Sequence, residues 1–413
     1  MNYRIIRYSR LQYADRLKNL YSRNPGLTDK SYDDQLTAIY NSNCMYNNSF
    51  SRSMNSFGNQ AFDFFSDFEI LQKSWAREHK LKYEEESWKD DIMLGQINFY
   101  KPEVVYFQDT ENISHSKRKS LRDRFPFIRL VSLYSGFPSR LNELDDIDVL
   151  IVGTPRLVEQ YKKNGFDPSL VYHGFDKEVL SKLEKCDDEK IYYDFSFIGS
   201  SGYGYGLGHR SRYWTLKELK NRTNIHLWLE ERDDLLVSKR KMKSRISIMR
   251  FLEKLYTIIK TTIFSSDRSV QNNEIEANAN VPTIPMKKLF KEQCYPTFFG
   301  LDMYKILSRS KVTFNMHTDA AEGVVGNMRM FEATGIGTCL LTDTGSNMAD
   351  LFIEDQEVVT YQSVDECIEK LDYLLDNGAV RKEIALAGQN KTLKNHTLSI
   401  RYAEIDRIIQ RKL

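Results

Sequence analysis

Short apolar runs rich in β-branched and aromatic residues alternate with helical patterns along most of this chain, and this alternation limits the folds that it can adopt. VVYFQ (104–108) and DVLIVGT (148–154) have the length and composition of buried strands. PRLVEQYKKNGF (155–166) then shows helical spacing behind an initial proline, and LVYHGFD (170–176) is extended again. Strands that alternate with helices predict an α/β fold with parallel sheets.

The alternation forms two series. The second series begins with YYDFSFIGS (192–200), continues through KVTFNM (311–316) and reaches EVVTY (357–361). The charged segment KLEKCDDEK (182–190) separates the series and is the natural linker. Two Rossmann-like domains that face a shared cleft are the economical interpretation, since ligands of such sheets bind beyond the carboxyl ends of the strands. We expect a first domain at 1–180, a second at 181–398 with an insertion of unassigned structure at about 230–295, and a C-terminal helix at 399–413 that can cross back to the first domain.

Charge and cysteine content exclude several classes of protein. Lys and Arg total 59 against 57 Asp and Glu, a net charge of +2, whereas dedicated nucleic-acid binders carry a clear basic excess. No apolar run approaches the roughly 18 residues that span a bilayer. The five cysteines are scattered without CxxC spacing, as free thiols in a reducing compartment are. We therefore expect a cytoplasmic protein with no nucleic-acid partner and no metal site.

The segment 238–264 is basic and has apolar residues at helical spacing. One interpretation is a surface helix that makes peripheral contact with anionic lipid at the inner face of the membrane. The other, commoner for such a helix, is packing on the body of the domain with the lysines in water.

A glycine-rich loop, GSSGYGYGLGHR (199–210), lies between a predicted strand and a predicted helix. Glycines let a backbone approach phosphate closely, and a helix N-terminus adds N–H groups and a favourable dipole. The loop is neither GxGxxG nor a Walker loop, so phosphate contact and a merely flexible loop both stay open. Its candidate donor-binding residues are Gly199, Ser200, Ser201, Gly202, His209 and Arg210.

The stretch AAEGVVGNMRMFEATGIGTCLLTD (320–343) follows the predicted strand 311–316, so it begins at a carboxyl end where ligands bind. A helix that starts near Gly326 would expose the amides of Asn327 and Met328. Glu332 follows within that helix, and a carboxylate there can accept two hydrogen bonds from a ribose diol. The alternative is a solvated or salt-bridged glutamate.

These residues also carry a resemblance to a known family. The segment from NMRMFEATGIGTCLLTDTG through RKEIALAGQNKTLKNHTLSIR, within 296–402, resembles the C-terminal half of CgeB-like glycosyltransferases, which are relatives of the retaining nucleotide-sugar enzymes with a GT-B fold. NNSFSRSMNSFGNQAFDFFSDFEILQKSWARE (47–78) resembles the acceptor-side region of the same branch, and VVYFQD (104–109) and DFSFIGS (194–200) fit it too. In the wider group an E-x7-E motif binds the donor. Glu332 matches its second glutamate, which binds the ribose, and Glu322 is a looser match to the first because ten positions separate the two here instead of eight.

The resemblance implies a GT-B, hexosyltransferase-type glycosyltransferase that moves a sugar from a nucleotide donor to a carbohydrate, lipid-linked or protein acceptor. The nucleotide sugar is then a substrate, with no cofactor and no metal. DDID (145–148) contains a metal-binding DxD pattern but precedes a strand, which favours a structural loop. An inactive nucleotide- or glycan-binding module and a nucleotide-sugar epimerase are the alternatives. The catalytic candidates are Asp109, Glu322 and His317; further donor-binding candidates are Asp319, Gly326, Asn327, Met328, Arg329 and Glu332; acceptor-binding candidates are Asn48, Ser49, Ser51, Arg52 and Glu69, with Asp109 or Glu69 as general base if the reaction inverts.

Overall fold

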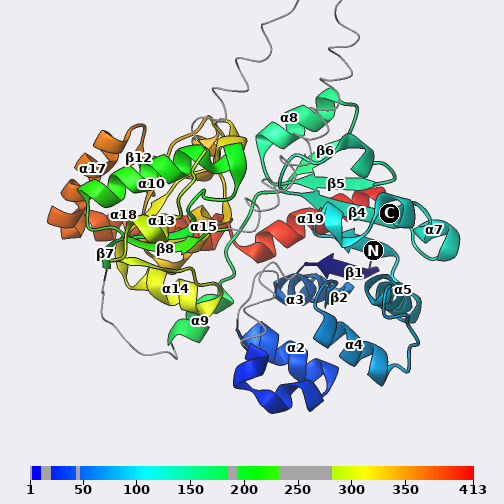
Figure 1. The fold of residues 1–413 in the computed structure, drawn as a ribbon. Helices are drawn as coiled ribbons and strands as arrows, with labels where there is room; N and C mark the ends of the chain where they lie inside the picture. The colour runs from blue at the N-terminus through cyan, green and yellow to red at the C-terminus, as the bar shows by residue number, and fades with distance from the viewer. Residues whose placement is uncertain (1, 11–19, 43–46, 185–192, 233–280) are drawn as a thin grey trace, which may run out of the picture.

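Two six-stranded parallel sheets form the frame of the protein in a computed structural model that describes residues 2–10, 20–42, 47–184, 193–232 and 281–413 (Figure 1). The predicted α/β class with two Rossmann-like sheets is confirmed. The first sheet has the order β2-β1-β3-β4-β5-β6 and the second β12-β11-β10-β7-β8-β9. The strands of the first sheet are β1 (Arg4–Ser9), β2 (Gln60–Phe65), β3 (Val104–Phe107), β4 (Leu130–Ser135), β5 (Val149–Val152) and β6 (Pro168–Leu170). Those of the second are β7 (Tyr193–Ser200), β8 (His226–Glu230), β9 (Cys294–Pro296), β10 (Ser310–Asn315), β11 (Cys339–Asp343) and β12 (Val359–Tyr361).

The inner strands β3, β4 and β5 are buried on both faces because helices cover the sheet. Every residue of β3 and of β5 is buried, and both are continuous apolar runs rather than alternating ones, as expected for a covered parallel sheet. The helices of the first domain are α2 (Tyr32–Asn41), α3 (Ser49–Ser56), α4 (Glu69–Glu78), α5 (Trp88–Tyr100), α6 (His115–Lys119), α7 (Leu121–Arg124) and α8 (Pro155–Lys163). Those of the second are α9 (Glu178–Glu184), α10 (Arg210–Arg222), α13 (Met286–Leu289), α14 (Leu301–Ser308), α15 (Met328–Ile336), α16 (Met348–Leu351), α17 (Val364–Asp376) and α18 (Gly378–Asn395).

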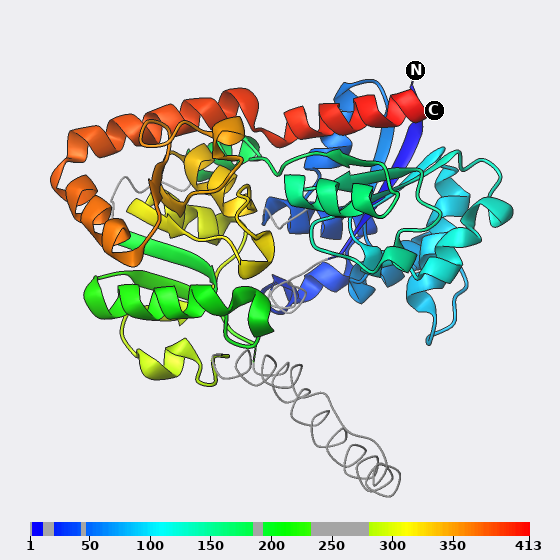
Figure 2. The same ribbon diagram turned by 90° about the horizontal axis from the view of Figure 1, so that it is seen from above.

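The last helix, α19 (Leu398–Lys412), packs against the first domain although it follows the second in the chain. Figure 2 shows α18 and α19 in succession across the two domains, with both marked chain ends at the first domain. The ring of Tyr402 meets that of Phe50 edge-on at 5.2 Å, and Asp406 accepts hydrogen bonds from Tyr3 (2.6 Å) and Asn59 (2.8 Å). These contacts make α19 a part of the first domain's core.

The chain crosses between the domains twice, and the two crossings lie side by side. The amide of Phe175 donates to the carbonyl of His396 (2.8 Å), and the amide of Leu398 donates to the carbonyl of Phe175 (2.9 Å). Gly174 is required at this point because a Cβ would lie 2.9 Å from the carbonyl carbon of Thr397. The two crossings therefore form one hydrogen-bonded connection.

Some predicted features lie outside the described residues. They include the basic segment 238–264, most of the insertion at about 230–295 and all but the beginning of the charged linker 182–190. In the part of the chain that the structure describes, no helix has the length and apolar character needed to cross a bilayer.

Candidate functional site

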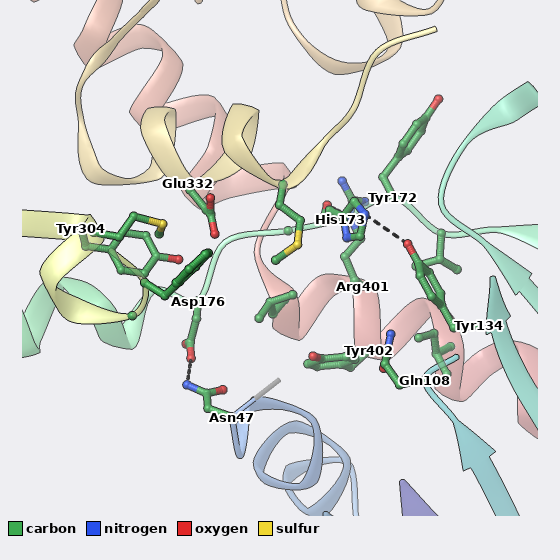
Figure 3. A pocket seen from close by; sticks show the side chains of 18 of the residues that line it. Asn47, Gln108, Tyr134, Tyr172, His173, Asp176, Tyr304, Glu332, Arg401 and Tyr402 are labelled. Carbon is green, nitrogen blue, oxygen red and sulfur yellow. Dashed lines mark hydrogen bonds between the residues drawn. The ribbon is translucent and has the colours of Figure 1, made fainter. Parts of the chain in front are cut away.

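The carboxyl ends of the two sheets meet at a cavity of about 320 Å³ between the domains, which we call the cleft cavity. The first domain contributes the loop 136–138 after β4 and the start of α8, and the second contributes residues from His317 to Met328. A smaller cavity of about 100 Å³, the hinge cavity, lies beside the crossings (Figure 3). Gln108, Tyr134, His173 and Met328 line both cavities, so the two adjoin.

The hinge cavity is enclosed by residues from both domains and from α19. Figure 3 shows Glu332 of α15 and Tyr304 of α14 on one side of it and Tyr402 and Arg401 of α19 on another. Phe299, Gly300 and Met303, which come from the loop after β9 and from α14, complete the wall of the second domain. The cavity thus combines the carboxylates of Glu332 and Asp176 with aromatic and apolar side chains.

Glu332 is nearly buried and is paired with a neighbour on its own helix. Its carboxylate lies 2.9 Å from the guanidinium of Arg329, one turn earlier, and the residue is 9 % exposed. Arg329 also contacts the sulfur of Met303 and lines neither cavity. The predicted donor-binding Glu332 therefore reaches the hinge cavity, whereas Arg329 acts on Glu332.

His317 lies at the cleft cavity, but both of its ring nitrogens have protein partners. Nδ1 donates to the carboxylate of Asp343 (2.8 Å), and Nε2 accepts from the amides of Gly326 (2.9 Å) and Asn327 (3.2 Å). This arrangement requires a neutral imidazole, since Nε2 needs its lone pair to accept. His317 therefore holds the beginning of α15 in place at the wall of the cleft cavity, and its catalytic contact with the donor stays a prediction.

The N-terminus of α15 is only partly available to a ligand. The prediction that this helix start exposes amides is wrong for Asn327, whose amide binds His317 as that of Gly326 does. The side chain of Asn327 caps the helix by accepting from the amide of Met330 (3.3 Å). The amide of Met328 has no acceptor among the described residues, and Met328 lines both cavities. Met328 thus brings the beginning of α15 to both cavities with an amide that is unpaired among the described residues.

Arg212, which the sequence did not single out, is the buried cation of the cleft cavity. It lies in the first turn of α10, is 8 % exposed, and donates to Ser200 Oγ (2.8 Å) and to the carbonyl of Met316 (2.5 Å). Its Nε has no hydrogen-bond partner, and no carboxylate of the described residues forms an ion pair with it. Burial lowers the pKa of Arg212 to about 10, while Asp343 raises it in opposition. The guanidinium is charged at neutral pH, and Asp343 and Asp319 compensate that charge only at a distance, since no carboxylate of the described residues is ion-paired with it.

The glycine-rich loop 199–210 packs on its own domain instead of lining a cavity. Gly202 and Gly204 have φ values of +91° and +84°, and a Cβ on Gly204 would lie 2.0 Å from the carbonyl oxygen of Arg232. Close approach of the chain to itself therefore explains these glycines. The structure places none of the loop's candidates in the wall of either cavity: Gly199, Ser200, Ser201, Gly202, His209 and Arg210.

Asp319 and Ser200 lie outside the walls of both cavities and bond to residues of α10. The carboxylate of Asp319 accepts from the amide (3.0 Å) and the hydroxyl of Ser211, which fixes the 3-10 turn η5 (Asp319–Ala321) to the first turn of α10. Ser200 Oγ accepts from Arg212 and lies 3.1 Å from His209 Nδ1. Both residues therefore orient Arg212 or its helix, which differs from their predicted contact with the donor.

Of the two acidic catalytic candidates, Asp109 lines the cleft cavity and Glu322 does not. Asp109, two residues beyond β3, lines the cleft cavity as its role as a general base would require. Glu322 does not line the cavity; it pairs with Arg156 of α8, which does, and so joins the two domains across the rim. Glu322 has a left-handed backbone (φ 48°), and its side chain is 53 % exposed.

None of the acceptor-side candidates lines either cavity, and one of them, Arg52, joins the domains. Arg52 on α3 pairs with Asp176 (3.1 Å) and Glu178 (2.6 Å), next to the first crossing. Glu69 lies on α4, where it pairs with Lys73 (2.7 Å). Neither cavity is lined by any of the five residues that the sequence suggested for the acceptor: Asn48, Ser49, Ser51, Arg52 and Glu69.

A buried histidine at the second crossing should make the fold sensitive to acid. The Nε2–H of His396 donates to the carbonyl of Leu351 (2.9 Å), and Nδ1 accepts from Arg401 (2.6 Å). Burial and Arg401 lower the pKa of His396 from 6.5 to about 4. Between these values the unfolded chain binds a proton that the folded chain does not, so the free energy of unfolding falls as the pH falls. Urea unfolding at several pH values should therefore show a shallower acid slope for His396→Gln than for the wild type; equal slopes would contradict this assignment.

Acidic groups near the cleft form no metal site in the described residues, where no group of three or more His, Cys, Asp or Glu side chains converges. In the DDID segment, Asp146 contacts His115 (3.0 Å), and Asp148 accepts from the amide of Val131 (2.7 Å) just before β5. These contacts agree with the predicted structural role of the segment.

Comparisons with known proteins give the same fold. A family model described as "glycosyl transferase-like" matches residues 249–407, and no curated protein sequence matches the chain. The structure of Anabaena HepE with UDP-glucose is similar with a TM-score of 0.55 and 8 % identity, over 99 % of this chain and 100 % of that one. An α-glucosyltransferase with UDP and a 13-mer DNA gives 0.53 and 12 % over 99 % and 100 %, and a glycosyltransferase from Rickettsia africae gives 0.51 and 10 % over 100 % and 98 %. With its two facing Rossmann-like sheets and this likeness over nearly its whole length, the protein has the GT-B fold of glycosyltransferases.

Proposed function

We propose that this protein is a hexosyltransferase-type glycosyltransferase that uses a nucleotide sugar, with UDP-sugars as the first candidates, and works without a metal ion. The observation that carries the proposal is Arg212, a buried guanidinium in the cavity between the two GT-B domains whose Nε has no hydrogen-bond partner and which is ion-paired with no carboxylate of the described residues. A buried charge is costly unless a partner compensates it. A diphosphate supplies that partner, and arginine binds phosphate through paired hydrogen bonds.

The two adjoining cavities suit the two ends of such a donor. In the hinge cavity, Glu332 is positioned to accept hydrogen bonds from ribose hydroxyls, and Phe299, Met303 and Tyr304 offer apolar walls to a base. The diphosphate would lie near Arg212 and the amide of Met328, where the positive end of the α15 dipole adds to the attraction. The sugar and the acceptor would then occupy the rest of the cleft cavity.

The reaction breaks the bond between the anomeric carbon and the β-phosphate oxygen and forms one from that carbon to an acceptor hydroxyl oxygen. The electrons of the broken bond leave with the nucleoside diphosphate, whose developing charge Arg212 and the helix dipole would stabilise. In an inverting reaction, Asp109 would take the proton of the acceptor hydroxyl, since it lines the cleft cavity from the first domain. Family similarity over 249–407 and the structural neighbours, which are complexes with UDP-glucose or UDP, support the same donor class.

A panel of nucleotide sugars tests the proposal. We expect one donor to raise the unfolding temperature, since a ligand at about 100 times its dissociation constant stabilises by about 2.7 kcal/mol. The same donor should release free nucleoside diphosphate, and the rate should persist in excess EDTA because Arg212 and the α15 N-terminus take the place of a metal ion. Binding without turnover would instead indicate a binding module, an isomerised donor would indicate an epimerase, and a rate that only Mn²⁺ or Mg²⁺ restores would overturn metal independence.

A further inference from the structure

An exposed aromatic ring stands in the first domain's wall of the cleft cavity. Phe137 is 66 % exposed, the highest value among the large apolar side chains of the described residues, and it lines the cavity together with Gly136 and Pro138. Single exposed apolar residues are common on protein surfaces and need no function. Phe137 differs from those because it combines exposure with a place in the cavity wall and with a fixed backbone.

The backbone around Phe137 is held by the core beneath it. Its carbonyl accepts from Ser135 Oγ (2.8 Å), and the amide of Ser139 donates to the hydroxyl of Tyr161 (2.9 Å), a fully buried side chain of α8. Gly136 packs closely as well, since a Cβ there would lie 3.3 Å from the ring of Tyr134. A loop without these contacts would fold the phenyl ring away from water, whereas the fixed backbone of this loop keeps the ring exposed at the cleft cavity.

Polar side chains of the same domain share that wall with Phe137. Gln108, Asp109, Arg156 and Gln160 all line the cleft cavity, and each carries a planar group that can bond two neighbouring hydroxyls. Only one of the four is cationic, and Arg156 is already paired with Glu322, so the wall lacks the basic excess that a nucleic acid needs. An acyl chain would need a continuous apolar wall, which these four side chains interrupt.

We propose that Phe137 is the platform on which the acceptor binds, and that the reacting part of the acceptor is a pyranose ring. One face of a pyranose presents axial C–H groups that pack on an aromatic ring, while its equatorial hydroxyls bond to planar polar groups at the edge. Phe137 supplies the aromatic ring, and the four polar side chains supply the planar groups that bond to the hydroxyls. This inference rests on the proposed glycosyl transfer and narrows its acceptor to a carbohydrate.

The test uses the full-length protein, saturated with UDP, and a panel of methyl pyranosides of gluco, galacto, manno and N-acetylglucosamine configuration. Saturation-transfer NMR should find at least one pyranoside that receives magnetisation mainly at the axial protons of one ring face. Phe137→Ala should weaken its binding at least about fivefold, since an aromatic contact of this kind is lost. Phe137→Tyr keeps the ring and should restore binding.

Phe99→Ala is the matched control because Phe99 is also strongly exposed, at 58 %, but lies on α5 outside both cavities. It should bind the pyranoside like the wild type, and thermal unfolding checks that every variant is folded. Equal binding by Phe137→Ala and the wild type, or no pyranoside bound by the UDP-saturated protein, would overturn the inference. Calorimetry with UDP on the same preparation separates the two proposals: UDP binding without pyranoside binding removes only the acceptor, whereas failure to bind any nucleoside diphosphate removes the proposed function.

Discussion

Arg212→Met is expected to weaken the binding of UDP by at least about a hundredfold. Two charge-assisted hydrogen bonds to a diphosphate contribute roughly 1.5–3 kcal/mol each, and every 1.4 kcal/mol corresponds to a decade in affinity. The stability of the free protein should change less than the affinity, because the loss of the bonds to Ser200 and Met316 is offset by removal of a buried charge that no ion pair of the described residues compensates. Calorimetry with UDP and urea unfolding of the free protein measure the two effects separately.

Arg210→Met is the matched control for Arg212→Met. Arg210 lies two residues earlier, at the beginning of the same helix, but lines neither cavity. The two variants lose the same charge, so a general electrostatic effect would weaken UDP binding equally in both. We expect a loss of affinity only for Arg212→Met, and equal losses, or none for Arg212→Met, would refute the assignment of the diphosphate to Arg212.

Glu332→Ala is expected to weaken UDP binding by about one to three decades, because the ribose hydroxyls lose a charged acceptor. Glu332→Gln should have a smaller effect, since an amide oxygen still accepts. The ion pair with Arg329 means that Glu332→Ala also lowers the free energy of unfolding, by roughly 1–3 kcal/mol, as it leaves a nearly buried guanidinium without its partner. Position 332 therefore differs from a surface position on a helix, where replacing a glutamate would hardly change the free energy of unfolding.

A nucleotide without ribose hydroxyls separates these two effects of Glu332→Ala. The 2′,3′-dideoxy form of UDP offers nothing for the carboxylate to bond, so the wild type and both Glu332 variants should bind it with similar affinity. If Glu332→Ala weakened the binding of UDP and of its dideoxy form equally, the carboxylate would act through the structure of α15 and not through the ribose.

The sheets could be predicted because their strands are continuous apolar runs that the chain itself displays. VVYFQ and KVTFNM correspond to β3 and β10 within one or two residues at each end. Glu332 could be related to the donor because the sequence around it carries a resemblance as well as a helical pattern. Local patterns such as these depend on neighbours in the chain.

The rest of the site depends on contacts between distant segments. His317 has the residue type and the position of a ligand-binding group, but only the fold brings Asp343 and the amides of α15 to its two nitrogens. Arg212 had a signal that could have been used: it lies four and seven positions before the buried Leu216 and Leu219, so it shares their inward face of α10. The acceptor-side candidates Asn48, Ser49, Ser51 and Arg52 line neither cavity, and sequence alone could not reveal that Arg52 pairs with the crossing between the domains.

The placement of α19 has a consequence for how this protein forms during translation. The ribosome completes both sheets before it makes Leu398–Lys412, yet Tyr402, Ile405 and Ile409 belong to the same buried cluster as Tyr3 and Ile5. Until these late residues emerge, the early part of the chain exposes an apolar surface that its own sequence does not cover. Domains made first usually fold first on the ribosome. Here the first domain is completed by residues that are synthesised after the whole of the second domain. It therefore reaches its full stability, and covers its apolar surface against aggregation, only after α19 has been made.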